Sequence, residues 1–215
     1  MPLAAPLDDG LNLQPVRALL AAQGALIGAR RIREGDEAGF LGPSPLAPAG
    51  SKRRRAGGAA RIVARRLIAE LGGDPSAALA RTPSGAPQWP DRLVGSLAHD
   101  NDFAVAAVAR RGRLKGIGVD IEPAEPLPED IVDFVLSETE RRLTDGDGLQ
   151  RRLVFVAKEA VYKAVHPFDG SELEFEHVEV RLAEARATLH DGRVLSLVTH
   201  AGLKLIAVAL LTNGV

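Results

Sequence analysis

The sequence contains no cysteine, which excludes disulfide bonds, thiolate metal sites and thiol catalysis. Aromatic residues make up only 4% of the chain, and the formal net charge is -1, so no overall field draws the protein toward nucleic acid. Apolar runs such as residues 205–211 are too short to span a bilayer. The first twenty residues lack the basic start and apolar run of a signal peptide, so we expect a cytoplasmic protein that does not interact with membranes.

What is present points to a folded chain. Hydrophobic residues make up 46% of 215 positions, enough for one large domain or two small lobes with a sizeable core. Without cysteine, any metal must be held by oxygen or imidazole, and carboxylate oxygens favour a hard ion such as Mg²⁺. One segment, residues 51–66, is rich in lysine and arginine and has no acidic residue, which indicates either an anionic ligand or a solvated helix.

Periodicity and turn residues predict a mixture of helices and strands. We expect helices at 52–71, in two pieces within 127–143, and at 151–167, where His166-Pro167 should end the last one. We expect strands at 25–32, in a pair within 93–113 joined by a polar turn at 99–102, at 116–123, and repeatedly from 172 onward. Gly57-Gly58 should weaken the first half of the helix at 52–71.

One layout occurs twice along the chain. Residues 93–109 and 193–211 each contain Ser-Leu, a histidine near a turn and an apolar strand. Each follows a segment with a basic helix. This repetition predicts an α+β fold made of two related lobes, which we place at 1–112 and 113–215.

Acidic and basic residues gather in two segments of the second lobe. Asp120 and Glu122 alternate with apolar residues, so a strand would place both carboxylates on one face. Glu159 and Lys163 are four residues apart, so a helix would place them on one face, with Lys158 beside them. Each group alone is compatible with an ordinary strand edge or surface ion pair. Together, three carboxylates and two lysines suit Mg²⁺ and a phosphate ester.

These segments also carry a family resemblance. GIGVDIEP (116–123) and FVAKEAVYKA (155–164) resemble, in order and spacing, the signature of 4′-phosphopantetheinyl transferases. Residues 93–109 look like the family's hairpin with its coenzyme A-contacting histidine. Residues 51–72 are similar to the basic coenzyme A-binding segment of the monomeric enterobactin-synthetase and surfactin-synthetase type, and 85–90 look like the loop bordering the adenine.

The resemblance implies a two-lobed fold with a pseudo-twofold axis and an active site in the cleft between the lobes. It implies a Mg²⁺-dependent monomer that moves phosphopantetheine from coenzyme A to a serine of an apo acyl or peptidyl carrier protein and releases 3′,5′-ADP. Such enzymes serve fatty acid, polyketide, nonribosomal peptide and siderophore synthesis, and the sequence does not rank these carriers.

Roles follow residue by residue from the resemblance. Asp120, Glu122 and Glu159 would hold the metal, and Asp120, Glu159 and Lys163 would be catalytic. Either Glu159 or a water on the metal would take the proton from the serine. The residues expected to bind coenzyme A are Lys52, Arg53, Arg54, Arg61, Gly85, Ala86, Pro87, His99, Lys158 and Lys163.

Other interpretations stay open at this point. A different Mg²⁺-dependent enzyme acting on nucleotides or diphosphates could use the same three acids. A nucleic-acid-binding module could use residues 51–66, although few aromatic residues accompany the basic ones and the acids would have no role. A third possibility is a degenerate family member that only docks carrier proteins, and the acids and lysines that the sequence retains argue against it.

Overall fold

The computed structural model describes residues 7–40, 52–82 and 85–212. The helices are α1 (Gln14–Ala21), α2 (Lys52–Glu70), α3 (Glu129–Val135), α4 (Glu138–Leu143) and α5 (Gly148–Asp169), with short 3-10 turns η1 (Asp36–Gly39), η2 (Phe175–His177) and η3 (Leu182–Glu184). The strands are β1 (Ala25–Arg31), β2 (Leu93–His99), β3 (Phe103–Arg110), β4 (Leu114–Pro123), β5 (Val178–Arg181), β6 (Arg186–Leu189), β7 (Val194–Ala201) and β8 (Lys204–Thr212). Within these ranges, no helix has the length and apolar character needed to cross a membrane.

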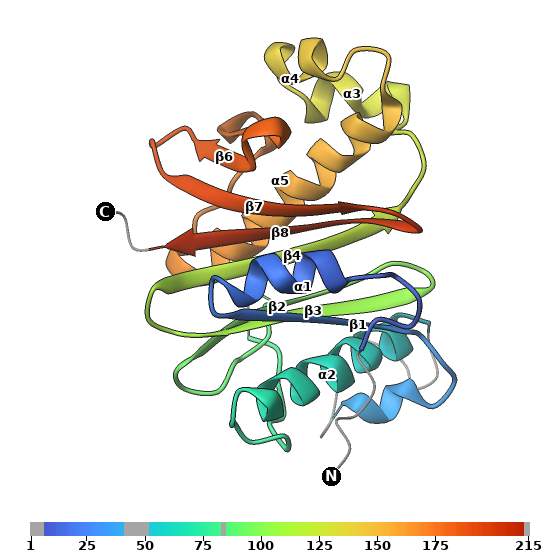
Figure 1. The fold of residues 1–215 in the computed structure, drawn as a ribbon, viewed down its shortest axis with the longest axis vertical. Coiled ribbons are helices and arrows are strands. Elements are labelled where there is room, and N and C mark those ends of the chain that lie inside the picture. The colour runs from blue at the N-terminus through green and yellow to red at the C-terminus, as the bar shows by residue number, and fades with distance from the viewer. Residues whose placement is uncertain (1–6, 41–51, 83–84, 213–215) are drawn as a thin grey trace.

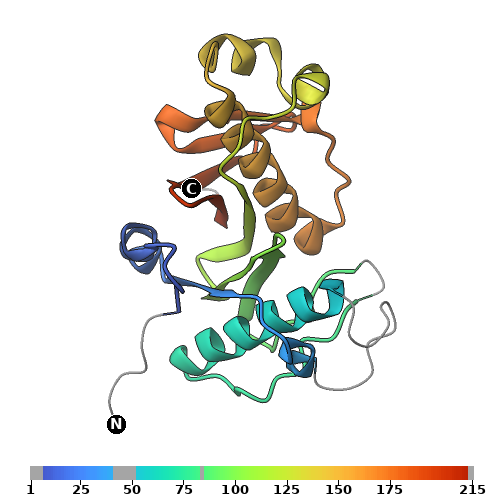
Figure 2. The same ribbon diagram turned by 90° about the vertical axis from the view of Figure 1, so that its right-hand side faces the viewer.

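The strands form two antiparallel sheets. A three-stranded sheet has the order β1-β3-β2, and a five-stranded sheet has the order β4-β8-β7-β6-β5. Figure 2 shows α2 packed on the small sheet in one half of the molecule and α5 packed on the large sheet in the other. The expected α+β class is therefore confirmed.

Buried central strands explain where the core lies. β3 and β8 are each flanked by strands on both sides, and their sequences FAVAAVA and KLIAVALL are almost continuously apolar and buried. The α5 stripe of Val154, Ala157, Val161 and Val165 is also buried, as its helical spacing predicts. Helix and sheet thus bury complementary apolar faces in both halves.

The two glycines in α2 do not weaken it, contrary to the sequence-based expectation. The helix is continuous from Lys52, and η1 lies directly against it. A Cβ atom on Gly58 would lie 1.9 Å from the carbonyl oxygen of Asp36, and one on Gly39 would lie 2.1 Å from the carbonyl oxygen of Gly58. Glycine is needed here because the two backbones touch, and this contact outweighs its poor helix propensity.

The predicted end of α5 is also wrong. The helix continues through Pro167 to Asp169 and ends at Gly170, whose φ of 74° is the left-handed conformation typical of helix ends. Pro167 has no N–H to donate to the carbonyl oxygen of Lys163, so the last turn of the helix continues with one intrahelical hydrogen bond fewer. Ser137 and Glu140 have the spacing that predicts a capping box, and α4 begins with one: the Ser137 side chain accepts a hydrogen bond from the backbone N–H of Glu140.

Candidate active site

Two glycines in β4 bring the acidic strand and the basic helix together. A Cβ atom on Gly118 would lie 1.9 Å from the carbonyl oxygen of Ala160, and one on Gly116 would lie 2.2 Å from that of Ala164. α5 can therefore cross β4 at backbone contact, which any side chain would prevent. This close crossing explains why β4 has glycine at 116 and 118, on the strand face that Asp120 and Glu122 share.

The crossing places acids and a lysine within reach of one another. Asp120 is 7% exposed, and its Oδ1 atom lies 2.5 Å from the ammonium of Lys163 on α5. Glu122 lies two residues further along β4 and pairs with Arg152 at 3.1 Å. Glu159 sits one helical turn before Lys163. The structure thus brings together the predicted acids and one of the two predicted lysines.

The electrostatics of this group favour a cation. Burial raises the pKa of Asp120 although Lys163 opposes the shift. Burial and then the negative charge of Asp120 raise the pKa of Glu122 and of Glu159. The charge of Asp120 therefore disfavours the ionised forms of Glu122 and Glu159, as expected where a positive ligand is to be added. Within residues 7–40, 52–82 and 85–212, no three acidic or histidine side chains already surround a common metal position.

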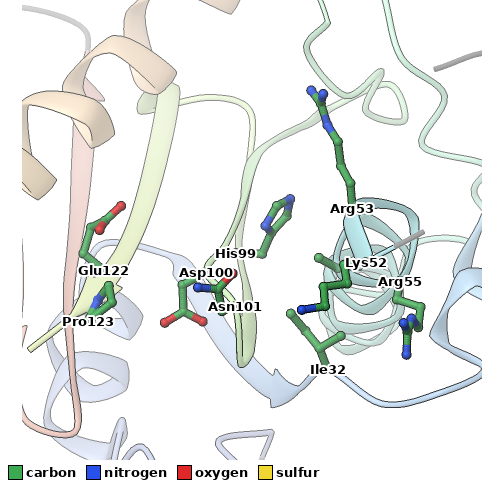
Figure 3. A pocket seen from close by; sticks show the side chains of 10 residues that line it. Ile32, Lys52, Arg53, Arg55, His99, Asp100, Asn101, Glu122 and Pro123 are labelled. Atoms are coloured by element: carbon green, nitrogen blue, oxygen red, sulfur yellow. The ribbon is translucent and has the colours of Figure 1, made fainter. Parts of the chain in front are cut away.

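A pocket of about 570 Å³ opens on the Glu122 side of these acids. Figure 3 shows its opposed walls: Glu122 and Pro123 from β4, the turn His99–Asn101, and the basic start of α2 with Lys52 and Arg53. The structure thus places three predicted coenzyme A-binding residues beside a predicted metal ligand.

A second pocket, of about 280 Å³, opens on the other side, where Lys163 lies. Ala86 and Pro87 line it together with Trp89, and Gly85 precedes them in a turn with φ of 88°. The predicted adenine loop and the predicted phosphate-binding lysine therefore share one cavity. Asp120 lies on β4 between the stretches of strand that line the two pockets.

A third and larger pocket, of about 900 Å³, reaches Glu159 from the direction of α3 and α4. Phe134, Phe175 and Tyr162 form an aromatic part of its wall, and further acids, among them Glu172 and Glu174, lie along the rest. Phe134 is 74% exposed and meets the Phe175 ring edge-on, with 5.5 Å between the ring centroids. This cavity offers apolar surface next to an acidic side chain.

His99 lies in a markedly positive environment. Desolvation lowers the pKa of its imidazole, although the residue as a whole is exposed at the pocket mouth, and the charges of Lys163, Arg53 and Arg81 lower it further. Sequence reasoning missed Arg81, which carries no motif. Its one signal is its position just before the adenine loop, where its backbone bridges to Pro87. A histidine among several cations suits a strongly anionic ligand.

Lys158 is not part of this group, contrary to the sequence-based expectation that it binds phosphate. Its ammonium is buried, pairs with Glu140 at 2.7 Å, and donates hydrogen bonds of 2.9 Å to the carbonyl oxygens of Val135 and Phe175. Burial lowers the pKa of Lys158 in spite of its partner. Its donors are thus directed at α4, at the end of α3 and at η2.

Arg61 is likewise turned into the protein rather than toward a ligand. It is 2% exposed, and its guanidinium donates hydrogen bonds of 3.0 Å to the carbonyl oxygens of Leu79 and Gly57. The guanidinium carbon lies 4.2 Å from the centroid of the Phe40 ring, and Arg54 lies over the same ring at 5.9 Å. Burial lowers the pKa of Arg61 to about 10. Arg61 therefore holds α2 against the segments that contain Leu79 and Phe40.

Comparisons with known proteins agree on one family. The model of the 4′-phosphopantetheinyl transferase N-terminal domain matches residues 42–109, and that of the 4′-phosphopantetheinyl transferase superfamily matches residues 116–204. The 4′-phosphopantetheinyl transferase Npt of Nocardia iowensis is 40% identical over 152 residues, which cover 68% of each chain. The 4′-phosphopantetheinyl transferase Svp of Streptomyces mobaraensis is 40% identical over 126 residues, 56% of this chain and 51% of the relative.

Among solved structures, the holo-[acyl-carrier-protein] synthase of Thermotoga maritima is similar at 20% sequence identity and a TM-score of 0.38, over 47% of this chain and 65% of that one. This likeness is too distant to support an argument.

Proposed function

The chain belongs to the 4′-phosphopantetheinyl transferase family, and from this premise we propose that it moves phosphopantetheine from coenzyme A to a serine of an apo acyl or peptidyl carrier protein, releasing 3′,5′-ADP. The observation that carries the proposal is the crossing of α5 over β4. It sets Asp120, Glu122, Glu159 and Lys163 side by side, with a basic pocket on one side and the predicted adenine loop on the other.

We propose that Asp120, Glu122 and Glu159 hold Mg²⁺. Oxygen ligands suit this ion, and burial raises the pKa of all three carboxyl groups, with the charge of Asp120 adding to the shift of Glu122 and of Glu159. When bound, Mg²⁺ supplies positive charge against the pyrophosphate of coenzyme A. Lys163 and Arg152 now neutralise part of the acid cluster, so metal binding would involve a rearrangement of these two ion pairs.

The side chains of the crossing then have separate tasks. Glu159 would accept the proton of the incoming serine hydroxyl, and burial raises its pKa, which makes it a stronger base than an exposed glutamate. Lys163 would stabilise the charge that develops on the departing phosphate as the bond to the transferred phosphorus breaks. Before metal binds, Asp120 holds Lys163 beside the acids through the 2.5 Å contact.

Coenzyme A fits across the cavities described above. The adenine would lie against Ala86 and Pro87, and the 3′-phosphate would lie near His99, Arg53 and Arg81, where positive charge is concentrated. Lys52 would add charge from the rim of the same pocket.

The pantetheine arm would lie in the aromatic cavity that reaches Glu159.

The two halves of the molecule support a further part of the proposal. Residues 1–112 and 113–215 would be related lobes with a pseudo-twofold axis, because each contains a long helix packed on a sheet with a central buried strand. The active site would then lie in the cleft where β2 approaches β4. An internal pseudo-dimer makes a second copy unnecessary, so we propose a cytoplasmic monomer.

Mass spectrometry of a purified apo carrier incubated with enzyme, coenzyme A and Mg²⁺ tests the function. The carrier should gain the mass of one phosphopantetheine group, and Glu159→Gln should abolish the gain. Glu70→Gln, which changes an exposed acid at the end of α2, is the matched control and should behave like wild type. No gain with several acyl and peptidyl carriers would contradict the proposal. Release of 3′,5′-ADP without any carrier would instead favour a diphosphate hydrolase.

A further inference from the structure

A lysine outside every motif joins the two sheets beside the basic pocket. Lys204 begins β8 and is 7% exposed. Its ammonium lies 2.6 Å from Asp100 and 2.8 Å from Asp102, both in the turn between β2 and β3. It also lies 5.7 Å from the centroid of the Phe103 ring. One side chain of the large sheet thus holds the hairpin of the small sheet.

Asp100 connects this contact to the conformation of the turn. Its Oδ1 atom accepts hydrogen bonds from the backbone N–H groups of Asp102 at 2.8 Å and Phe103 at 2.7 Å, which closes the turn. Its other oxygen faces Lys204. Asp100 directly follows His99, so the contacts that fix Asp100 and its turn also limit where the backbone of His99 can lie.

The position of Lys204 in the sheet decides which part of β4 is fixed relative to the turn between β2 and β3. Lys204 is the register partner of Pro123, and Leu205 is the partner of Glu122, in the pairing of β4 with β8. Figure 3 shows Glu122 and Pro123 facing His99 and Asp100 across the pocket. The ion pair therefore spans from the acidic wall of this pocket to its histidine wall and sets the distance between them.

We propose that Lys204 is a positioning residue for coenzyme A: by holding Asp100 and Asp102 it sets the distance between His99 and the acid cluster that one ligand must bridge. The inference rests on the proposed function, in which His99 faces the 3′-phosphate and the acids face the pyrophosphate. Both groups belong to one molecule with a fixed spacing, so a shift of the turn would lose one contact or the other.

A purely structural ion pair would predict something different. Every variant that breaks such a pair would lose stability, and the effect would not depend on which phosphate the ligand carries. A positioning role affects the 3′-phosphate contact selectively. Coenzyme A and 3′-dephospho-coenzyme A therefore serve as matched probes, since they differ only in the group that His99 would contact.

The experiment measures binding of both probes by isothermal titration calorimetry at a temperature where each variant is folded. Supporting partners of site residues typically matter by ~10–100-fold, so Lys204→Met should weaken coenzyme A by about tenfold. 3′-Dephospho-coenzyme A should bind wild type and Lys204→Met equally. Lys204→Arg should restore most of the affinity, and Lys204→Met should add little to His99→Ala because both remove the same contact.

Two further variants control for folding. Asp102→Asn removes one partner whose side chain is 59% exposed, so it should fold and should weaken coenzyme A less than Lys204→Met does. Arg193→Met removes another cation that bridges two aspartates, Asp169 and Asp191, away from the pockets, and should leave affinity unchanged.

Equal losses for both probes, additive effects with His99→Ala, or a wild-type affinity for coenzyme A in Lys204→Met would each overturn the inference. Failure of the wild-type protein to bind coenzyme A at all would overturn the proposed function, and the inference with it.

Discussion

The buried pair of Lys158 and Glu140 gives the sharpest contrast between a binding role and a packing role. Their side chains are 1% and 0% exposed, and the two charged atoms lie 2.7 Å apart. Glu140 also accepts hydrogen bonds from the backbone N–H groups of Val180 at 2.7 Å and Ser137 at 2.8 Å. We predict that Lys158→Met destabilises the protein strongly while leaving its affinity for coenzyme A unchanged.

The size of the stability loss follows from the charge of Glu140, which Lys158→Met leaves buried without its partner. Removing one partner of a buried ion pair typically costs about 3–5 kcal/mol, because the remaining charge stays buried without compensation. Two backbone carbonyls, those of Val135 and Phe175, also lose their donor, at about 1 kcal/mol or more each if they stay buried. Domains of this kind are stable by only about 5–15 kcal/mol, so the loss is a large fraction of the total.

Urea denaturation followed by far-UV circular dichroism measures this loss. Glu140→Gln should lower the free energy of unfolding by a similar amount. The double variant should lose less than the sum of the two single variants, because each single change leaves the other residue buried without its partner. Arg186→Met breaks a pair of which both side chains are 52% exposed and should cost about 0–1 kcal/mol. Near-wild-type stability of Lys158→Met combined with a large loss of coenzyme A affinity would refute the packing role and restore the phosphate-binding one.

Three other predictions concern backbone contact, metal and pH. Gly58→Ala should destabilise by about 1–3 kcal/mol despite its better helix propensity, because the added Cβ would lie 1.9 Å from the Asp36 carbonyl oxygen; an equal or higher midpoint in urea would contradict this. Chelation of divalent ions should stop carrier modification and added Mg²⁺ should restore it, whereas full activity in excess chelator would rule out the metal. Burial lowers the pKa of Lys204, but its hydrogen bonds to Asp100 and Asp102 outweigh this and raise it above 10.5. A lysine whose pKa is raised by folding stabilises the protein fully below its unfolded pKa, and this stabilisation is lost as the pH rises through the folded pKa. The stability lost in Lys204→Met should therefore be full at neutral pH and shrink as the pH rises past the unfolded pKa. A stability difference between wild type and Lys204→Met that stays constant with pH would contradict this.

The sequence was sufficient wherever a local pattern decides the outcome. The alternation around Asp120, the apolar stripe of α5 and the capping box at Ser137 each depend on neighbours in the chain, and the structure has them as predicted. The pairing of the two motif segments also followed, because their order and spacing are those of the family.

The remaining errors arise from contacts between distant segments. The tight packing of η1 on Gly58 decides that α2 is unbroken, and nothing near that glycine in the sequence reveals the contact. Lys158 and Arg61 were assigned to phosphate because they are cationic and lie in the right motifs. Their burial depends on Glu140 and on Leu79, eighteen residues from each partner, and so required the fold. Lys204 has no motif at all, and its role depends on a turn more than a hundred residues away.

A crystal structure with coenzyme A and a divalent ion tests the central claim most directly. We predict that the metal lies on Asp120, Glu122 and Glu159, that the pyrophosphate lies beside Lys163, and that the 3′-phosphate lies beside His99. Coenzyme A bound away from the crossing of β4 and α5, or a metal that does not contact these three carboxylates, would contradict the account.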